Sequence, residues 1–212
     1  MTRAYSDDYL YYAQKNMGHM LDFAVNSCDI EPDKFIAMFL TSSVAEQFES
    51  GNSAYLTGMS GCELVRVIVK ETTDTEITAE DNIYIDKSPE YWTGWAVCYY
   101  QWYSCRPFKN IFDAVSVNTV IGMYNTLHEA DISKFTETMD KLISDFYKET
   151  ALARQRKNAG MTQSELAEVS GVSVRIIQKY EQKKNDINSA KVSTLLSLSK
   201  ALHCKIEDLM EY

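Results

Sequence analysis

The chain has 212 residues, with 21 basic and 30 acidic side chains and a formal net charge of −9. Hydrophobic residues make up 45%, which excludes a disordered or collagen-like chain, and only 8 Gly and 3 Pro favour a mainly helical fold. No apolar run approaches the roughly 18 residues of a membrane-spanning helix, and the N-terminus lacks the apolar core of a secretory signal. Five scattered cysteines indicate reduced thiols, so we expect a cytoplasmic protein without a metal site.

Charge is distributed unevenly along the chain. Residues 1–147 carry 10 basic and 22 acidic side chains, residues 148–212 carry 11 and 8, and residues 151–184 carry seven and three. Such asymmetry favours a nucleic-acid-binding segment joined to something else. We therefore predict an acidic helical module over 1–147, with a sub-boundary near 71–88, and a DNA-binding domain over 148–212. The alternative is two solvated surfaces of different sign, because charge governs association rather than fold.

The N-terminal region is predicted to form a series of helices. Apolar residues within 7–28 recur at helical spacing, and Pro32 suits the first turn of another helix. The Gly- and Ser-rich stretch 51–61 predicts a turn, and the apolar run 62–69 fits either a helix or a strand. Residues 71–88 alternate weakly in polarity and hold the best candidates for a strand or an ordered loop.

The segment 88–108 is rich in aromatic residues. Ser88 followed by Pro89 predicts a helix N-terminus, because Pro is favoured at the first helical position. Aromatic side chains combine a large apolar area with polar tips, so this segment forms either the core of a helical bundle or a surface for a small ligand or a protein partner. The candidate residues for such a surface are Tyr91, Trp92, Trp95, Tyr99 and Trp102.

Downstream, a short helix precedes a long amphipathic one. Asp131 is placed to cap the long helix. Its apolar face follows the helical spacing of Phe135, Met139, Leu142 and Phe146. Because no Pro or Gly follows before Leu152, the helix is expected to run into the first helix of the C-terminal region or to end just before it.

The C-terminal region carries a local pattern for two short helices joined by a turn. Thr162 and Glu165 form a capping box, in which the Thr hydroxyl accepts a backbone N–H and the Glu side chain reaches back. A helix is therefore predicted over about 163–169. Gly171 ends this helix, because Gly enters the left-handed region without steric cost. Ser173 is the next N-cap candidate, so the second short helix completes a helix-turn-helix.

The apolar spacing of the same region predicts five helices in all. Leu152 begins the first helix, a longer helix is expected to be capped near Asn188 or Ser189, and Ile206 marks a final turn. The apolar residues of the two motif helices, their turn and the last two helices are Leu166, Ala167, Val169, Val172, Ile177, Tyr180, Leu195, Leu196, Leu198, Ala201, Leu202, Ile206 and Leu209.

The C-terminal sequence resembles the Cro/CI-type (lambda-repressor-like) helix-turn-helix family of phage repressors and bacterial regulators. The resemblance is carried by MTQSELAEVSGVS, IIQKYE and LLSLSKALHCKIEDL, within about 150–212. It implies a five-helix DNA-binding domain whose second motif helix meets the major groove. The positions that it places at DNA are Gln163, Ser173, Val174, Arg175, Gln178 and Lys179, and past the helix Lys183 and Lys184 are expected to neutralise phosphates.

The residue types at these positions suit double-stranded DNA. An Arg side chain can bind guanine as a fork and a Gln side chain can bind adenine, whereas a Ser hydroxyl suits a phosphate. Val174 and Ile176 are apolar where the family is often polar; they either touch thymine methyl groups or, for Ile176, pack against the rest of the chain. The stretch KKNDIN replaces the family's commoner Gly-Lys turn, which leaves the geometry of this loop open.

The N-terminal region is similar to helical modules that accompany such domains in Firmicutes regulators. This likeness is carried by MGHMLDFAVNSC, GMSGCELVR, YWTGWAVCYYQWYS and TLHEADISKF. Residues of about 8–70 are similar to a small helical domain found beside toxin–antitoxin genes. The resemblance implies no particular chemistry.

No motif for catalysis, phosphate binding or a cofactor is present. The three histidines at 19, 128 and 203 are far apart in the sequence. We therefore expect a non-enzymatic transcription regulator, which as a homodimer represses transcription from a palindromic operator in double-stranded DNA. One alternative is an antitoxin whose acidic module over 1–147 neutralises a toxin. The others are a regulator that senses a small ligand through the aromatic segment and an enzyme with dispersed catalytic residues.

Overall fold

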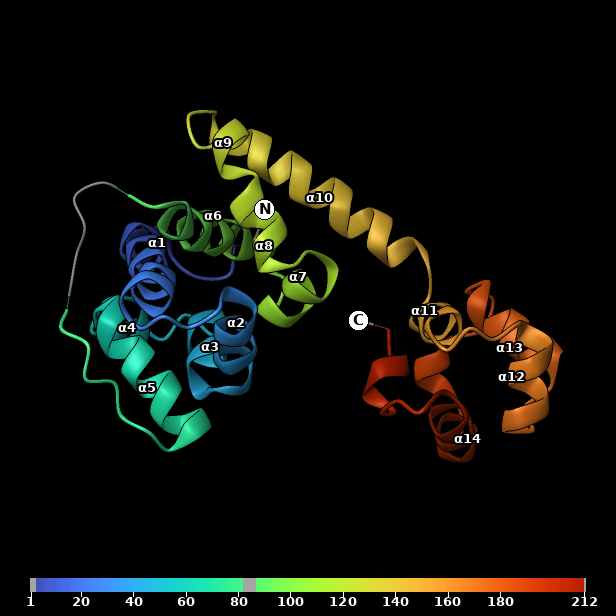
Figure 1. The fold of residues 1–212 in the computed structure, drawn as a ribbon. Coiled ribbons are helices and arrows are strands. Elements are labelled where there is room, and N and C mark those ends of the chain that lie inside the picture. Colours follow the sequence, from blue (N-terminus) through green and yellow to red (C-terminus); the bar gives the residue numbers. More distant parts are fainter. Residues whose placement is uncertain (1–2, 82–86, 212) are drawn as a thin grey trace. The chain divides into compact units, whose positions relative to one another are not determined.

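The computed structural model describes residues 3–81 and 87–211. Within these ranges the protein contains fourteen α-helices and no strand, and 72% of it is helical, which confirms the mainly α fold. The chain forms two compact units, Met1–Ile143 and Ser144–Tyr212 (Figure 1). None of the described helices combines the length and the apolar character needed to cross a membrane.

The N-terminal unit consists of a series of helices of different lengths. Its α-helices are α1 (Asp7–Asp22), α2 (Pro32–Thr41), α3 (Ser43–Glu49), α4 (Ser53–Leu56), α5 (Gly61–Thr73), α6 (Pro89–Ser104), α7 (Phe108–Ala114), α8 (Val117–Gly122), α9 (Tyr124–Leu127) and most of α10 (Ile132–Lys148). A π-helical turn, Phe23–Ser27, follows α1 directly.

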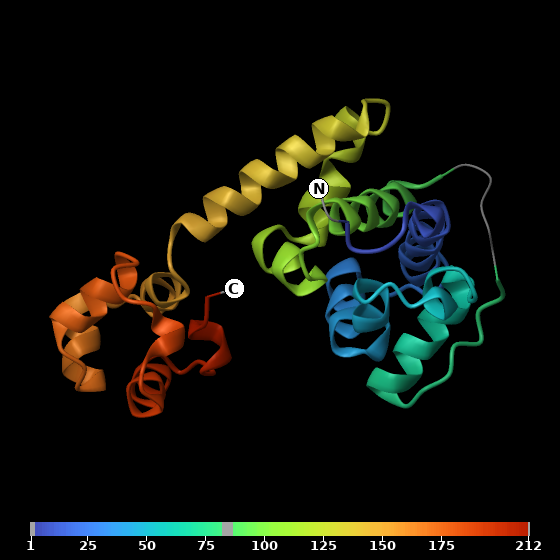
Figure 2. The same cartoon turned by 180° about the vertical axis from the view of Figure 1, so that it is seen from behind.

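Helices α1 and α6 form the centre of this unit and lie side by side in both views (Figures 1 and 2). Two glycines allow the close approach. A Cβ atom on Gly94 would lie 2.3 Å from the carbonyl oxygen of Met17, and one on Gly18 would lie 2.8 Å from the ring of Tyr91. Any larger residue at Gly94 would therefore push the two helices apart.

Residues 62–69, which fitted either a helix or a strand, form part of helix α5. Ser60 caps it with a complete capping box, in which Glu63 binds the Ser60 backbone N–H at 2.7 Å. A Cβ on Gly61 would lie 2.6 Å from the backbone N of Met20, so the first turn of α5 packs directly on α1. The apolar core of the unit is completed by the fully buried rings of Phe23, Phe35, Phe39, Phe48, Tyr100, Phe108 and Phe135.

Two expectations for this unit need correction. The stretch 51–61 is not only a turn, because Asn52 caps the short helix α4 within it. The expected strand or ordered loop over 71–88 begins inside α5, and the described residues 75–81 form no strand. Residues 82–86 of that stretch lie outside the described part of the chain.

Helix α10 begins where the sequence predicts. The Asp131 carboxylate accepts the backbone N–H of Ser133 at 2.8 Å. The buried face consists of Phe135, Thr136, Met139 and Ile143. Leu142 and Phe146 are only half-buried, because Ile143 and not Leu142 lies on the buried face of the helix. The helix ends at Lys148, just before α11, which is one of the two outcomes expected from the sequence.

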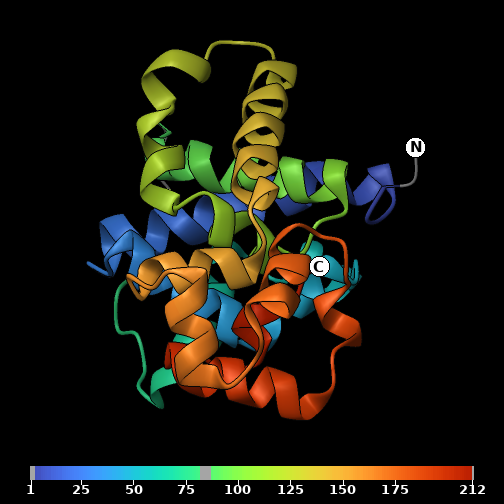
Figure 3. The same cartoon turned by 90° about the vertical axis from the view of Figure 1, so that its right-hand side faces the viewer.

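The C-terminal unit contains four α-helices, α11 (Ala151–Asn158), α12 (Gln163–Ser170), α13 (Val174–Glu181) and α14 (Val192–Leu202), and a final 3-10 turn, Glu207–Leu209 (Figure 3). They are the five expected elements, the last of them tighter than an α-helix. Helix α12 packs on both α13 and α14. The core that joins them comprises Leu152, Leu166, Val172, Ile177, Ile187, Leu195, Leu198, Ala201, Leu202 and Leu209.

Three details of this unit differ from the sequence prediction. Helix α14 is not capped near Asn188 or Ser189, because Asp186 holds the Asn188 backbone in a separate 3-10 turn and the helix starts at Val192. Val169 and Leu196, two of the apolar residues in the predicted helical pattern, are 63% and 43% exposed. Both are apolar residues at helical spacing, but the packed faces of α12 and α14 leave them on the outside.

Candidate nucleic-acid interface

The first motif helix, α12, is bounded by the predicted residues. The Thr162 hydroxyl accepts the Glu165 N–H at 3.2 Å, and the Glu165 carboxylate accepts the Thr162 N–H at 2.7 Å. These bonds lower the pKa of Glu165 below its ordinary value. Gly171 ends the helix with φ +70° and bonds back to the Ala167 carbonyl. The capping box and the turn Gly are thus confirmed.

The second motif helix, α13, begins at Val174, three residues after Gly171, and two core positions fix its orientation. Val172 and Ile177 are buried, so the helix presents its other side to solvent. Ser173 occupies the N-cap position as predicted, but its hydroxyl makes no capping bond. That hydroxyl therefore stays available to a ligand such as a phosphate.

The solvent side of α13 and the loop after it carry most of the predicted DNA-contacting residues. Arg175 and Gln178 are exposed, as is Ser173 before them, whereas Val174 and Lys179 are half-buried. Lys183 and Lys184 follow in the loop and are exposed. Ile176 is 39% exposed, so its side chain is not enclosed by the core of its own unit.

Gln163 lies beside this side of α13, but its amide is already engaged. Its Nε2 donates to the Glu181 carboxylate at 2.8 Å, and its Oε1 accepts from Gln178 at 3.4 Å. The two glutamines predicted to contact DNA are therefore bonded to each other across the two motif helices. One Gln163 N–H remains for a phosphate, since a primary amide has two.

Glu181 is held by an arginine that the sequence pattern did not single out. Arg156 binds it at two points, 2.7 and 2.9 Å, and donates to the Met161 carbonyl at 2.7 Å. Burial raises the pKa of Glu181, but the bonds from Arg156 and Gln163 outweigh it and hold that pKa below its ordinary value. The pair removes the negative charge of Glu181 from the surface of α13.

The basic residues of 151–184 divide into two groups. Four bind partners within the unit: Arg154 donates to the Phe146 and Glu149 carbonyls, Arg156 to Glu181, Lys157 to the Glu149 carboxylate, and Lys183 to the Tyr147 carbonyl. Across the described ranges, the side chains of the other three, Arg175, Lys179 and Lys184, make no hydrogen bond or ion pair. The available positive charge is therefore concentrated on α13 and the loop that follows it.

The loop after α13 has a defined geometry despite lacking the commoner Gly. Lys183 adopts a left-handed φ of 54°, and its backbone N–H binds the Tyr180 carbonyl. Lys184 then donates its backbone N–H to Lys179. A lysine thus occupies the conformation that a glycine would adopt without strain.

The aromatic candidates of the N-terminal unit separate into two groups along α6. Trp92 is almost fully buried, and with the half-buried Tyr91 and Trp95 it lines one pocket. Trp102 donates its indole N–H to the Tyr5 carbonyl at 2.9 Å, and Tyr99 packs beside it at the other end of the helix. The five residues therefore do not form a single surface.

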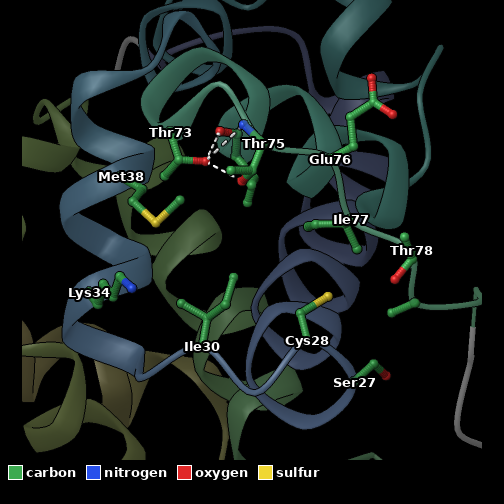
Figure 4. A pocket seen from close by; sticks show the side chains of 12 residues that line it. Ser27, Cys28, Ile30, Lys34, Met38, Thr73, Thr75, Glu76, Ile77 and Thr78 are labelled. Atoms are coloured by element: carbon green, nitrogen blue, oxygen red, sulfur yellow. Dashed lines mark hydrogen bonds between the residues drawn. The ribbon is translucent and has the colours of Figure 1, made fainter.

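A different pocket, of about 460 Å³, lies between the π-helical turn, α2, α5 and residues 75–79 (Figure 4). Ile30, Met38 and Ile77 line its apolar part, and the hydroxyls of Thr73 and Thr75 bond to each other at 2.6 Å at its edge. None of the predicted site residues lines it. Among the described residues, no group of three His, Cys, Asp or Glu side chains is arranged to hold a metal ion.

Comparison with known proteins supports one of the two units. Residues 152–209 match a family described as Helix-turn-helix, over less than a third of the chain. No curated protein and no solved structure matches. The resemblance of the N-terminal region to toxin–antitoxin-associated modules stays a prediction. The C-terminal unit is a Cro/CI-type helix-turn-helix domain, the DNA-binding domain of a family of transcription regulators rather than of enzymes.

Proposed function

We propose that this protein is a repressor that binds a palindromic operator as a homodimer, with α13 of each copy in the major groove. The observation that carries this proposal is the presence of unpaired cations on α13, Arg175 and Lys179, while the acid of the same helix, Glu181, is bound to Arg156. Positive charge without a partner in its own chain is suited to phosphates and to base edges.

The exposed residues of α13 have different roles in this proposal. Arg175 and Gln178 read base edges, Lys179 supplements them, and Val174 contacts a thymine methyl group. Ser173 and the remaining N–H of Gln163 bind phosphates at the ends of the motif helices. Lys184 neutralises a phosphate, and Lys183 assists with those N–H groups that it does not use for the Tyr147 carbonyl.

A dimer follows from the small number of base contacts that one α13 can make. A helix of eight residues touches only a few base pairs, and two half-sites about one DNA turn apart double that number. An N-terminal region that gains order with a partner would favour the antitoxin alternative. Met1–Ile143 forms a compact unit with its own core, so no observation favours that alternative.

Selection of bound duplexes from a random pool tests the proposal with the full chain. The expected result is an enriched inverted repeat whose half-site centres lie about 10 base pairs or a multiple apart. The variant Arg175→Ala/Lys179→Ala should lose this enrichment, and Lys200→Ala/Lys205→Ala, which removes the same charge elsewhere in the unit, should retain it. Enrichment that survives the first variant, or no enrichment with the wild type, would overturn the proposal.

Repression itself needs a separate readout. Transcription in vitro from a promoter that overlaps the selected repeat should fall as the protein is added, because the bound dimer blocks the polymerase. A rise in transcription from the same template would assign activation instead.

A further inference from the structure

An aromatic pocket in the N-terminal unit is lined by residues that lie outside the helix-turn-helix domain. Its volume is about 330 Å³, at the lower end of the range for small-molecule sites. Tyr91, Trp92 and Trp95 of α6 form one wall, Tyr124 and Leu127 of α9 form another, and Ile132, the first residue of α10, adds to the lining.

The aromatic walls are held in place by packing. Trp92 meets Tyr124 edge-on with ring centroids 5.9 Å apart, and it meets the buried Phe135 edge-on at 5.5 Å. Tyr124 stacks on His128 at 4.3 Å, and the His128 ring bonds to the Tyr124 carbonyl through Nδ1 at 2.7 Å. A planar guest therefore meets preformed ring faces and loses little free energy to reorganisation.

Lys87 is the one residue with a permanent charge among the described residues that line the pocket. Its Nζ lies 4.2 Å from the Tyr91 ring centre and 3.2 Å from His19 Nε2. Burial, followed by the charges of Lys87 and Lys15, lowers the pKa of His19 against the opposing charge of Asp22, which favours the neutral imidazole beside the Lys87 ammonium. No described residue of the lining carries a carboxylate.

Three described acidic side chains near the pocket have other partners or face solvent. The Asp22 carboxylate accepts from Asn26 at 3.0 Å and from the Ser88 hydroxyl. The Glu90 carboxylate accepts from Asn26 at 3.2 Å, and the Glu129 side chain is 89% exposed, 3.7 Å from His128 Nε2. The pocket of Figure 4 differs in kind, because Lys34 and Glu76 both line it and no aromatic ring does.

We infer that the aromatic pocket binds a small aromatic carboxylate, with its ring between the α6 and α9 side chains and its carboxylate at the Lys87 ammonium. Ring faces and apolar walls supply the affinity, and the ammonium selects the anion. This site stands independently of operator binding, because none of its residues lies in the helix-turn-helix domain.

Three fluorinated probes of equal size test the inference with the full-length protein. They are 4-fluorobenzoate, 4-fluorobenzamide and 4-fluorobenzylamine, which share the fluorinated ring and carry a negative, a neutral and a positive group, and their binding is followed by the broadening of the fluorine resonance. We expect the benzoate to bind about fivefold more tightly than the benzylamine, because the attraction to Lys87 acts near a solvated surface. Equal binding of all three, or broadening of none at millimolar concentration, would overturn the inference.

Variants locate the binding and keep the test independent of folding. Lys87→Glu, at an exposed position, should reverse the order so that the benzylamine binds best. Lys141→Glu makes the same change of net charge on the exposed side of α10 and should leave the order unchanged. Trp95→Leu should weaken all three probes, whereas Tyr12→Leu, at an aromatic that is 52% exposed on α1, should not. An unchanged order with Lys87→Glu would show that the anion binds elsewhere and would overturn the assignment.

Discussion

The Arg156 guanidinium and the Glu181 carboxylate form a two-point ion pair that connects α11 to the end of α13. The Nε–Oε1 and Nη2–Oε2 distances are 2.7 and 2.9 Å, and the two side chains are only 12% and 7% exposed. The pair sets the position of α13 relative to α11. It also binds Gln163 through the second oxygen of Glu181, so stability and the DNA-facing side share one network.

Removal of one partner of this pair should destabilise the C-terminal domain. Glu181→Gln leaves the Arg156 charge largely buried without its counter-ion, and we expect a loss of about 2–3 kcal/mol in the free energy of unfolding. Urea denaturation followed by circular dichroism measures it. Glu168→Gln, at an exposed acid of α12, is the matched control and should change stability by less than about 0.5 kcal/mol. Equal effects of the two variants would show that the ion pair adds nothing to stability.

The same carboxylate should give stability a defined pH dependence. The folded pKa of Glu181 lies below its ordinary value of 4.5, so its contribution is complete above pH 4.5 and is lost as the pH falls through the lower folded value. The difference in unfolding free energy between the wild type and Glu181→Gln should therefore be constant from pH 7 to pH 5 and shrink below pH 4.5. A difference that grows on acidification would contradict the lowered pKa.

Gly171 should be required for its backbone conformation and not for space. A Cβ at Gly171 would meet nothing within 4 Å, but the residue has φ +70°. We expect Gly171→Ala to cost about 1 kcal/mol of stability. Gly122→Ala is the control, because its Cβ would also meet nothing, while its φ is not positive. Thermal unfolding of both variants separates the two explanations, and an equal change in Tm would argue against strain at Gly171.

Arg175 should contribute to the choice of operator. Arg175→Ala removes a side chain that can bind guanine at two points, so we expect operator affinity to fall by about 1–3 kcal/mol and the preference at one base pair to relax. Fluorescence anisotropy with the selected operator and its single-base variants measures both effects. Lys200→Ala, on α14 of the same unit, serves as the control. A uniform loss of affinity for every sequence would reduce Arg175 to a phosphate contact.

Lys184 and Lys183 should differ in their effect on salt dependence. The Lys184 side chain makes no hydrogen bond or ion pair among the described residues, whereas the Lys183 ammonium donates to the Tyr147 carbonyl at 2.9 Å. We expect Lys184→Ala to reduce the slope of log K against log salt concentration by about one, and Lys183→Ala to reduce it by less. Binding measured across a salt series gives the two slopes. The reverse order would place Lys183 at the phosphate.

The helix-turn-helix was predictable because its signals are local. Thr162 and Glu165 cap α12 within one turn, and Gly171 ends it through its own backbone conformation. Nothing in the spacing of 7–28 showed that α1 would continue into a π-helical turn. The exposure of Val169 and Leu196 was also unforeseen, because apolar residues at helical spacing can occupy either of two neighbouring faces.

The candidate site was predictable as a set of positions but not as a set of available groups. The count of basic residues over 151–184 treated Arg154 and Arg156 as equal to Arg175. In the structure the first two bind carbonyls and a carboxylate of their own unit, and only Arg175 is unpaired within the described residues. No feature of the sequence distinguishes these arginines, because the partners of Arg154 and Arg156 come from outside their own helix.

The order of amino acids determined where the motif helices begin and end, since a capping hydroxyl, its acidic partner and a left-handed glycine act within a few residues of one another. The division of roles among the charged and aromatic side chains was decided only when the helices packed. Glu181 is 25 residues from Arg156, and Trp92 is still farther along the chain from Tyr124, so their contacts depend on which helix faces meet in the folded chain.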